Sequence, residues 1–330
     1  MYCFLTGANG FIGIRLAECL SSEGHNVRCL VRSPGKFSAL SHLPGVTAVT
    51  GDLSNSTALE EGVRGCDTVF HMAAYAKPWS KDKNLPYRVN VTGTENLLRA
   101  SLRGGVKRFV FTSSAAVIGP SPGVDPINEE FPRSVPFFNE YEETKAQAEN
   151  LVRDYCRDGM ETVIVNPSRV YGPGPENESN SMTKMIKLYS RGRWRIIPGD
   201  GKCTGNYVLV DDVVKGHILA ALRGRPGQRY ALGGENLTFL QFFESLAEVT
   251  EKRRRLVRFP VWLMISVARV MERQASITDI PPLITAAWVK KYLNHWSLSS
   301  QKAMTDIGYE YTPFREGARI TLEWLKKRES

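Results

Sequence analysis

The sequence lacks an apolar run of the roughly 20 residues that a membrane-spanning helix needs. Its best candidate, residues 257–271, is interrupted by Arg258 and Arg269, so we expect a buried or interfacial helix there that covers a pocket. The N-terminal segment MYCFLTGANG has no basic region and is typical of a strand rather than of a signal peptide. We therefore expect no transmembrane segment and at most weak peripheral contact with a membrane.

Cysteine is scarce and follows no known pattern. Six cysteines among 330 residues form no C-x-x-C pair and no Cys/His spacing typical of a zinc site. We therefore expect no metal site and no disulfide framework. This cysteine usage favours a reducing, cytoplasmic compartment.

The sequence also has no pattern typical of a nucleic-acid-binding module. Lys and Arg number 43 against 34 Asp and Glu, which gives a formal net charge of +9. Small basic clusters, such as Arg253–Arg255 and Lys326–Arg328, are interpreted as solvated helix ends and faces. We expect no nucleic-acid partner, and attribute the positive balance to attraction of anionic ligands such as a phosphorylated cofactor.

Strand-like and helix-like segments alternate through the first 170 residues, with short links between them. This alternation predicts an α/β fold, the doubly wound Rossmann arrangement, in which helices cover both faces of a parallel sheet. Strands are expected at 2–6, 26–31, 47–50, 68–71, 108–113 and 162–165. Helices are expected at 12–22, 56–63, 90–103 and 141–157.

The composition changes after residue 172, where a loop rich in proline and glycine begins. A chain of 330 residues is long enough for about two domains. We expect residues 1–172 and 203–233 to form an NADP-binding Rossmann domain, with 203–233 returning to the main sheet. Residues 173–202 and 234–330 are expected to form a smaller, mostly helical lid that binds substrate at the carboxyl edge of the sheet.

The segment TGANGFIG at 6–13 follows a predicted strand and opens a predicted helix. Gly7 permits a tight turn, Gly10 lets the backbone approach a pyrophosphate, and Gly13 lets helix and strand pack closely. This pattern predicts a dinucleotide-binding loop, and a glycine-rich turn without a ligand is the alternative. The residues expected at the cofactor are Gly7, Asn9, Gly10, Phe11, Ile12 and Gly13.

The end of the second predicted strand indicates which dinucleotide binds. An NAD site favours an acidic residue there, whereas this chain has Arg32 and Lys36, which suit the 2′-phosphate of NADP. We therefore expect NADP(H) to be preferred over NAD(H); the alternative is that Arg32 is only an exposed cation. Asp52 and Leu53 are expected at the adenine, although Asp52 fits the role of a helix cap equally well.

The spacing of Tyr141 and Lys145 places both side chains on one face of a predicted helix. An ammonium group near the tyrosine favours its phenolate. Ser114, at the end of a predicted strand, is suited to hydrogen-bond the same substrate oxygen. His71, also at a strand end, is expected to be a structural hydrogen-bonding residue rather than a catalyst.

Together these motifs resemble those of the extended short-chain dehydrogenase/reductases, which belong to the NAD-dependent epimerase/dehydratase family. The resemblance implies a small-molecule substrate and hydride transfer with a nicotinamide cofactor, in a monomer or a homodimer. The matching segments are TGANGFIG at 6–13, GDL at 51–53, HMAA at 71–74, NVTGTENLL at 90–98, FTSSAAVIG at 111–119, YEETK at 141–145, NPSRVYGPG at 166–174 and NYVLVDDVV at 206–214.

Within that family, the resemblance implies that Tyr141 is the acid/base. Lys145 would bind the nicotinamide ribose and lower the pKa of the tyrosine. Ser114 would orient the substrate, with Ser113 as the less favoured alternative. Asn90 would anchor a water and backbone relay behind Lys145. Further cofactor contacts would come from Ala73, Ala74, Tyr75, Pro167 and Ser168.

Departures from the family pattern indicate which branch of the family this chain resembles. Sugar-nucleotide dehydratases carry an Asp-Glu pair where this chain has Ala115 and Ala116. Many epimerases carry an arginine for the nucleotide diphosphate where this chain has Gly205. What remains resembles the dihydroflavonol-reductase-like and 3β-hydroxysteroid-dehydrogenase-like branch, with which AYAKPW at 74–79 also agrees.

We therefore predict an NADP-dependent carbonyl reductase or alcohol dehydrogenase acting on a hydrophobic molecule. Alternatives are a sugar or sugar-nucleotide epimerase that uses the cofactor transiently, and a non-catalytic NADP-sensing protein. Seven side chains are candidates for an apolar substrate pocket, with core or lid packing as the alternative for each. They are Tyr75, Trp79, Phe137, Phe138, Met182, Met185 and Trp262.

Overall fold

A seven-stranded, all-parallel sheet forms the centre of the computed structural model, which describes residues 1–77, 79–176, 178–278, 282 and 284–328. Its strand order is β10-β6-β5-β4-β1-β2-β3, so the chain starts in the middle of the sheet and builds outward in both directions. The strands are β1 (Tyr2–Thr6), β2 (Asn26–Val31), β3 (Val46–Thr50), β4 (Thr68–His71), β5 (Arg108–Thr112), β6 (Glu161–Pro167) and β10 (Arg229–Leu232).

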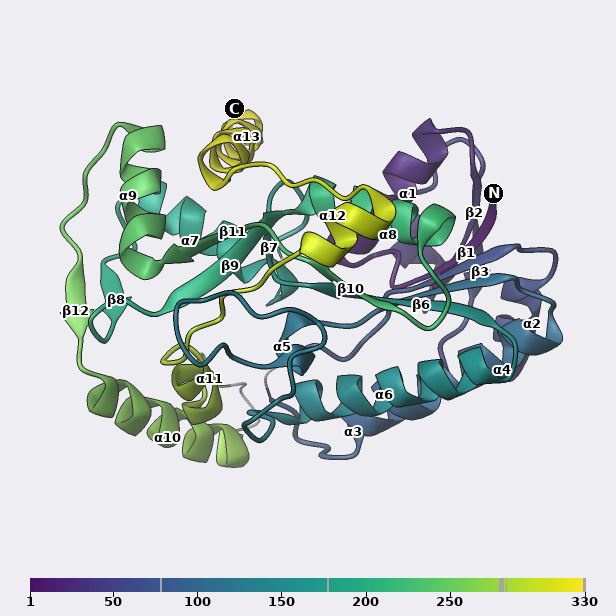
Figure 1. The fold of residues 1–330 in the computed structure, drawn as a ribbon, viewed down its shortest axis with the longest axis horizontal. Helices are drawn as coiled ribbons and strands as arrows, with labels where there is room; N and C mark the ends of the chain where they lie inside the picture. The colour runs from purple at the N-terminus through teal and green to yellow at the C-terminus, as the bar shows by residue number, and fades with distance from the viewer. Residues whose placement is uncertain (78, 177, 279–281, 283, 329–330) are drawn as a thin grey trace.

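Helices cover both faces of this sheet, as Figure 1 shows. One face packs against α1 (Phe11–Ser22), α8 (Val210–Arg223) and α12 (Gln301–Ile307). The other packs against α2 (Ser56–Val63), α4 (Gly93–Arg103) and α6 (Glu140–Arg157). Successive residues of a strand point to opposite faces, so Cys3 and Leu5 lie in the first core and Phe4 in the second.

A smaller part lies beyond the carboxyl edge of the sheet. Its three-stranded sheet has the order β11-β9-β7 and packs against three helices around a core rich in aromatic rings. A further pair of strands, β8 and β12, leads to two helices that pack on each other (Figure 1). The strands are β7 (Arg169–Tyr171), β8 (Ile196–Pro198), β9 (Thr204–Leu209), β11 (Glu235–Thr238) and β12 (Val257–Phe259); the helices are α7 (Ser181–Ser190), α9 (Phe239–Thr250), α10 (Val261–Thr278), α11 (Ala286–Lys291) and α13 (Phe314–Lys327).

The expected α/β fold with a doubly wound parallel sheet is confirmed, and most expected elements lie within a few residues of their observed bounds. Residues 257–271 differ, because β12 precedes α10 instead of one continuous helix. Pro260 explains the break, since the residue before a proline is pushed out of the helical region. Within 203–233, β10 joins the main sheet as expected, but β9 pairs in the three-stranded sheet.

Two short segments prepare the site. The predicted helix at 90–103 begins instead with η2 (Arg88–Thr92), a π-helical turn that follows α3 (Leu85–Tyr87) and carries Asn90. π-helical turns are often found at functional sites. After β5 comes α5 (Ala115–Ile118), whose N-cap residue is Ser114.

Candidate active site

The glycine loop joins β1 to α1 and requires glycine at two of its positions. Gly7 has φ +75°, and a Cβ on it would lie 2.7 Å from the backbone nitrogen of Ala73. A Cβ on Gly13 would lie 2.1 Å from the Gly7 carbonyl oxygen. The loop is therefore packed tightly against the segment that follows β4, which brings together two stretches expected at the cofactor.

Free polar groups at this edge fit a dinucleotide cofactor. Helix α1 begins after Gly10 with no side-chain cap, which leaves backbone N–H groups for a phosphate. The buried Oδ1 atom of Asn9 has no hydrogen-bond partner in the part of the chain that the structure describes, and the same holds for the Ser168 hydroxyl. Phe11 is buried beside the loop, whereas Ile12 is half-buried.

The groups expected at the adenosine end lie after β2 and β3. Arg32 and Lys36 are both exposed, Lys36 within the 3-10 turn η1 (Pro34–Phe37). Asp52 accepts hydrogen bonds from the Ser54 backbone N–H at 2.8 Å and the Ser54 hydroxyl at 2.6 Å. These bonds, with the charge of Arg32, lower the pKa of Asp52. Asp52 thus stabilises the turn before α2, while Leu53 is buried.

Asn90 ties the segment after β4 to the helix that carries Tyr141 and Lys145. Its Oδ1 accepts from the Tyr75 backbone N–H at 2.7 Å. Its Nδ2 donates to the Thr144 hydroxyl at 2.9 Å and to the Tyr75 carbonyl at 3.2 Å. Asn90 is 1% exposed, so these bonds are shielded from water. The side chain therefore fixes α6 one residue before Lys145, and Ala73, Ala74 and Tyr75 are left half-buried at the edge.

Tyr141 lies in the first turn of α6, whose N-cap is Asn139. Burial raises the pKa of Tyr141 to about 12, and the negative charge of Glu142 also raises it. A hydrogen bond with the Ser114 side chain acts in the opposite direction. Tyr141 and Ser114 are thus brought together, and the phenol holds its proton at neutral pH. Lys145 was expected to lower the pKa of Tyr141, but among the described residues only Ser114 lowers it.

Lys145, four residues after Tyr141 on α6, is buried. Its Nζ atom lies 3.9 Å from the centre of the Phe111 ring. Burial lowers the pKa of Lys145 to about 7, against a smaller raising effect from the buried carboxylate of Glu149. His71 is fully buried between the hydroxyls of Thr6 (2.7 Å) and Thr94 (2.9 Å). Burial, with the charge of Lys145, lowers the pKa of His71, which fits a neutral structural role.

A pocket continues from Ser114 toward the smaller part of the molecule. Its walls include Pro167 and Ser168 at the end of β6 and Arg169 at the start of β7. Lys291 of α11 and Trp296 form walls from the C-terminal segment. Pro167 and Ser168, which are expected to contact the cofactor, therefore line the same pocket as Ser114.

Arg169 is a pocket residue that the sequence reasoning missed. Its guanidinium donates to the Tyr207 hydroxyl at 3.1 Å and lies 4.7 Å from the centre of the Tyr292 ring. A Cβ on Gly205 would lie only 2.3 Å from Arg169 Nη1. At Gly205 the chain lacks the arginine that many epimerases use for the nucleotide diphosphate, but the guanidinium of Arg169 fills the adjoining space. Only the position of Arg169 within NPSRVYGPG pointed to it.

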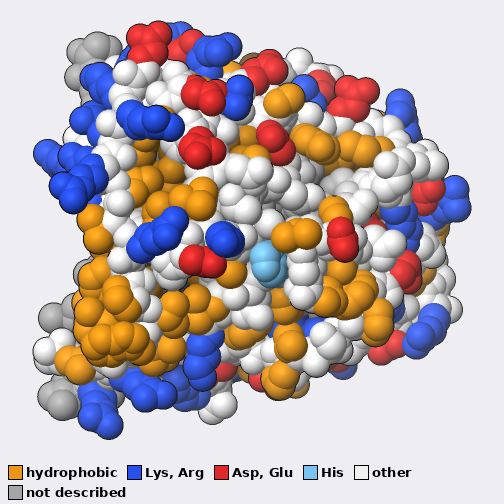
Figure 2. All heavy atoms as spheres, turned by 60° about the vertical axis from the view of Figure 1, so that its left-hand side comes forward, with side chains coloured by type: hydrophobic (Ala, Val, Ile, Leu, Met, Phe, Trp, Pro, Cys, Tyr) orange, Lys and Arg blue, Asp and Glu red, His pale blue; other side chains and the backbone are white. Residues whose placement is uncertain are grey.

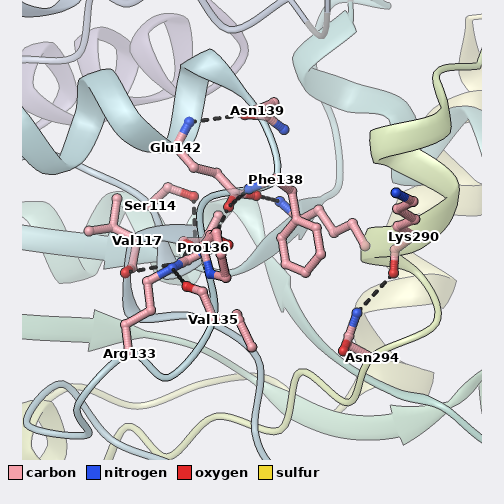
Figure 3. Close-up of polar contacts among 12 residues, drawn as sticks. Ser114, Val117, Arg133, Val135, Pro136, Phe138, Asn139, Glu142, Lys290 and Asn294 are labelled. Carbon is pink, nitrogen blue, oxygen red and sulfur yellow. Dashed lines mark hydrogen bonds and ion pairs between the residues drawn. The ribbon is translucent and has the colours of Figure 1, made fainter.

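A buried ion cluster anchors the start of α6 to the C-terminal segment. Glu142 is fully buried and accepts from Arg133 at 3.0 Å, from Lys291 at 2.9 Å and from the Phe138 backbone N–H at 3.2 Å. Figure 3 shows Arg133, Phe138 and Glu142 converging beside Ser114. Glu142 and Lys291 are 149 positions apart in the sequence, so no local sequence pattern predicts their ion pair.

The expected apolar pocket residues do not all meet. Phe138 lies near the pocket, with its ring centre 6.0 Å from that of Trp296. The Tyr75 hydroxyl donates to the Trp79 carbonyl at 3.1 Å, while Pro78 of the same motif lies outside the described residues. Met182 and Met185 are buried in the core of the smaller part, and are absent from the pocket walls given by the described residues. For Met182 and Met185, therefore, the alternative of plain core packing is correct.

Two further expected residues lie at the surface. Phe137 is 37% exposed, under the Arg133 guanidinium at 4.3 Å from its ring centre. Trp262 is 69% exposed on α10 and lies outside the described pocket walls. Across residues 1–328, apart from the short gaps named above, no three His, Cys, Asp or Glu side chains are arranged to hold a metal ion.

Comparison with known proteins gives a consistent result. The model of the NAD dependent epimerase/dehydratase family matches residues 3–233. A protein of Synechocystis sp. that carries the name of a dihydroflavonol 4-reductase is 30% identical over 98% of this chain and 94% of its own. A Mycobacterium tuberculosis protein named 3 beta-hydroxysteroid dehydrogenase/Delta 5→4-isomerase is 31% identical over 93% and 85%.

The fold also matches solved structures. UDP-glucose 4-epimerase from Thermotoga maritima, solved with UDP-glucose, superposes with a TM-score of 0.82. The two sequences are 25% identical, and the match covers all of both chains.

Proposed function

This chain belongs to the NAD-dependent epimerase/dehydratase family, and we propose that it is an NADP(H)-dependent oxidoreductase that interconverts a ketone or aldehyde and an alcohol on a hydrophobic small molecule. The proximity of Tyr141 to the side chain of Ser114, which itself lines a pocket, carries the proposal. The reductase and dehydrogenase names of the relatives at 30% and 31% identity support the same reaction class.

The protein's own groups would act on the carbonyl oxygen. The Ser114 hydroxyl would orient that oxygen, and the Tyr141 phenol, protonated at neutral pH, would give it a proton. A bound nicotinamide cofactor would supply the hydride to the carbonyl carbon. In the reverse direction Tyr141 would take the proton from the alcohol. Lys145 would hold the cofactor ribose, and Asn90 would hold the start of α6 in place through Thr144.

NADP(H) is the preferred cofactor in this proposal. Arg32 and Lys36 present exposed cations beyond β2, where a 2′-phosphate would lie. If Arg32→Ala left NADPH affinity unchanged, the 2′-phosphate argument would be wrong.

The test measures NADPH consumption with a panel of apolar ketones and aldehydes, for the native protein and Tyr141→Phe. Removal of the acid is expected to slow turnover by about 10²–10⁴-fold while NADPH binding persists. Tyr155→Phe serves as the matched control, because that tyrosine lies on the same helix and packs against the core beneath the sheet. Turnover that is equal in Tyr141→Phe and the native protein would refute the proposal.

Arg169 favours a second candidate, an epimerase acting on a sugar nucleotide. A guanidinium beside Gly205 puts a cation where the family's diphosphate-binding arginine would start. An epimerase would bind UDP-sugars, lose that binding in Arg169→Gln, and interconvert them with no net NADPH consumption. The reductase would consume NADPH in proportion to product.

A further inference from the structure

The positive charge of the protein is concentrated at one end. Residues 191–202 carry four Lys or Arg and one Asp, and residues 251–275 carry seven Lys or Arg and two Glu. The two segments therefore hold a net charge of +8, against +9 for the whole chain. They lie side by side because β12 pairs with β8, with Val257 opposite Ile196 (Figure 1).

Five arginines of this end face water. Arg193, Arg195, Arg253, Arg255 and Arg258 are all exposed, and none takes part in an ion pair among the residues that the structure describes. The sequence by itself predicts only a small solvated cluster at Arg253–Arg255. The structure adds a second basic segment beside it, so the charges sum into one field.

Exposed apolar side chains lie among these cations. Trp262 is 69% exposed, Val257 54%, Val270 55%, Ile196 41% and Val267 41%. Figure 2 shows this face, with a broad hydrophobic area bordered by Lys and Arg. Contiguous apolar surface of this kind on a soluble domain marks an interaction site rather than ordinary surface.

Helix α10 has two apolar faces with different partners. Met264 and Ala268 are buried in a small core that includes Val289 of α11. Trp262 and Val270 lie on the opposite, solvent-facing side, with the exposed Arg269 beside them. A helix that presents tryptophan and aliphatic side chains within a basic border has the composition of one that lies in a membrane interface.

We propose that this end of the protein, residues 191–202 and 251–275, docks on the surface of an anionic lipid bilayer. Trp262 and Val270 would enter the headgroup region, and the arginines would bind lipid phosphates and carboxylates. Nucleic acid would match the charge but would leave the aliphatic surface unused. In the described residues, no helix is long and apolar enough to cross the bilayer, so the contact is peripheral.

Docking would bring the pocket close to the bilayer. Helix α10 packs on α11, which carries the pocket residue Lys291. An apolar substrate dissolved in the membrane would then have a short path to the site. The docking inference itself stands on the surface alone and does not depend on which reaction the site performs.

Vesicle binding tests the inference. The full-length protein is mixed at low ionic strength with phosphatidylcholine vesicles, with or without phosphatidylglycerol, and bound protein is measured by flotation. We expect binding only to the phosphatidylglycerol vesicles, reversal by salt, and a blue shift of tryptophan emission that Trp262→Phe removes. Neutralising Arg253, Arg255 and Arg258 to Gln should weaken binding on the order of 100-fold.

Matched controls separate this surface from general charge and apolarity. Arg64 follows α2, Arg103 ends α4 and Lys107 lies shortly after it, all three exposed at the opposite end of the molecule. Their change to Gln therefore removes equal charge elsewhere. Leu222→Ser removes a 59% exposed apolar side chain from α8. Equal loss in test and control variants, or no vesicle binding by the native protein, would overturn the proposal. So would tight RNA binding, or a dimer that Trp262→Ser dissociates, with no binding to vesicles.

Discussion

Replacing Glu142 by glutamine would test whether the buried ion cluster holds the catalytic helix to the C-terminal segment. The amide keeps the shape of the carboxylate and can still accept from the Phe138 backbone N–H. It removes the one negative charge between Arg133 and Lys291, which lie at 3.0 Å and 2.9 Å. The two cations would then repel each other with no anion between them.

The expected cost follows from burial. Breaking a fully buried ion pair by removing one partner costs about 3–5 kcal/mol. The Arg133 and Lys291 side chains are 12% and 24% exposed, so water compensates in part. We therefore expect Glu142→Gln to lower the free energy of unfolding by about 2–3 kcal/mol, and the melting temperature by roughly 5 °C.

Thermal unfolding of four variants checks this value. Glu143→Gln is the matched control, since Glu143 is exposed on the next residue of the same helix. Lys291→Met removes one cation, and the double variant Glu142→Gln/Lys291→Met should be more stable than the sum of the two single changes predicts. The reasoning fails if Glu142→Gln melts at the same temperature as Glu143→Gln, or if the double variant is simply additive.

Three other predictions concern the site. Burial lowers the pKa of Lys145 from its usual 10.5 to about 7, so between these pH values the unfolded chain binds one more proton than the folded protein. The free energy of unfolding should therefore rise with pH in that window. Lys145→Met should flatten the rise, as measured by unfolding at pH 7 and pH 10. Arg32→Ala should weaken NADPH binding by about tenfold and leave NADH binding unchanged, as measured by cofactor fluorescence titration, since it removes one charge-assisted contact to the 2′-phosphate. Gly205→Ala should displace the Arg169 guanidinium, because the added Cβ would lie 2.3 Å from Nη1, and it would also press on the buried Tyr207 hydroxyl at 2.9 Å. The melting temperature should therefore fall and the KM for substrate should change. An unchanged KM would argue against a role for Arg169.

The features that could be predicted are those that depend on residues close together in the sequence. The glycine loop at residues 6–13 and the Tyr141/Lys145 spacing depend on neighbours within one turn, so their patterns located them. The alternation of strands and helices fixed the parallel sheet for the same reason. NADP preference and the roles of the site residues remain predictions.

The rest depended on contacts between distant segments. The proximity of Arg169 to Gly205 and the pairing of Glu142 with Lys291 are set by how the small part folds onto the sheet. Met182 and Met185 show a different limit, because an apolar side chain on a helix has the same pattern whether it faces a core or a pocket. Residues 257–259 are apolar enough to continue the helical pattern of α10, but Pro260 disfavours a helical backbone at Phe259, so they form the strand β12.

The pairing of Glu142 with Lys291 has a consequence for the order of events during synthesis. Domains generally fold from the N-terminus as the chain emerges from the ribosome. Helix α6 is complete by Arg157, whereas Lys291 lies 134 residues further along the chain. Until then Glu142 has Arg133 as its sole cationic partner among those described here. A nascent chain can therefore build most of its sheet early, but the helix that carries Tyr141 acquires its final anchor only after the C-terminal segment with Lys291 has been made.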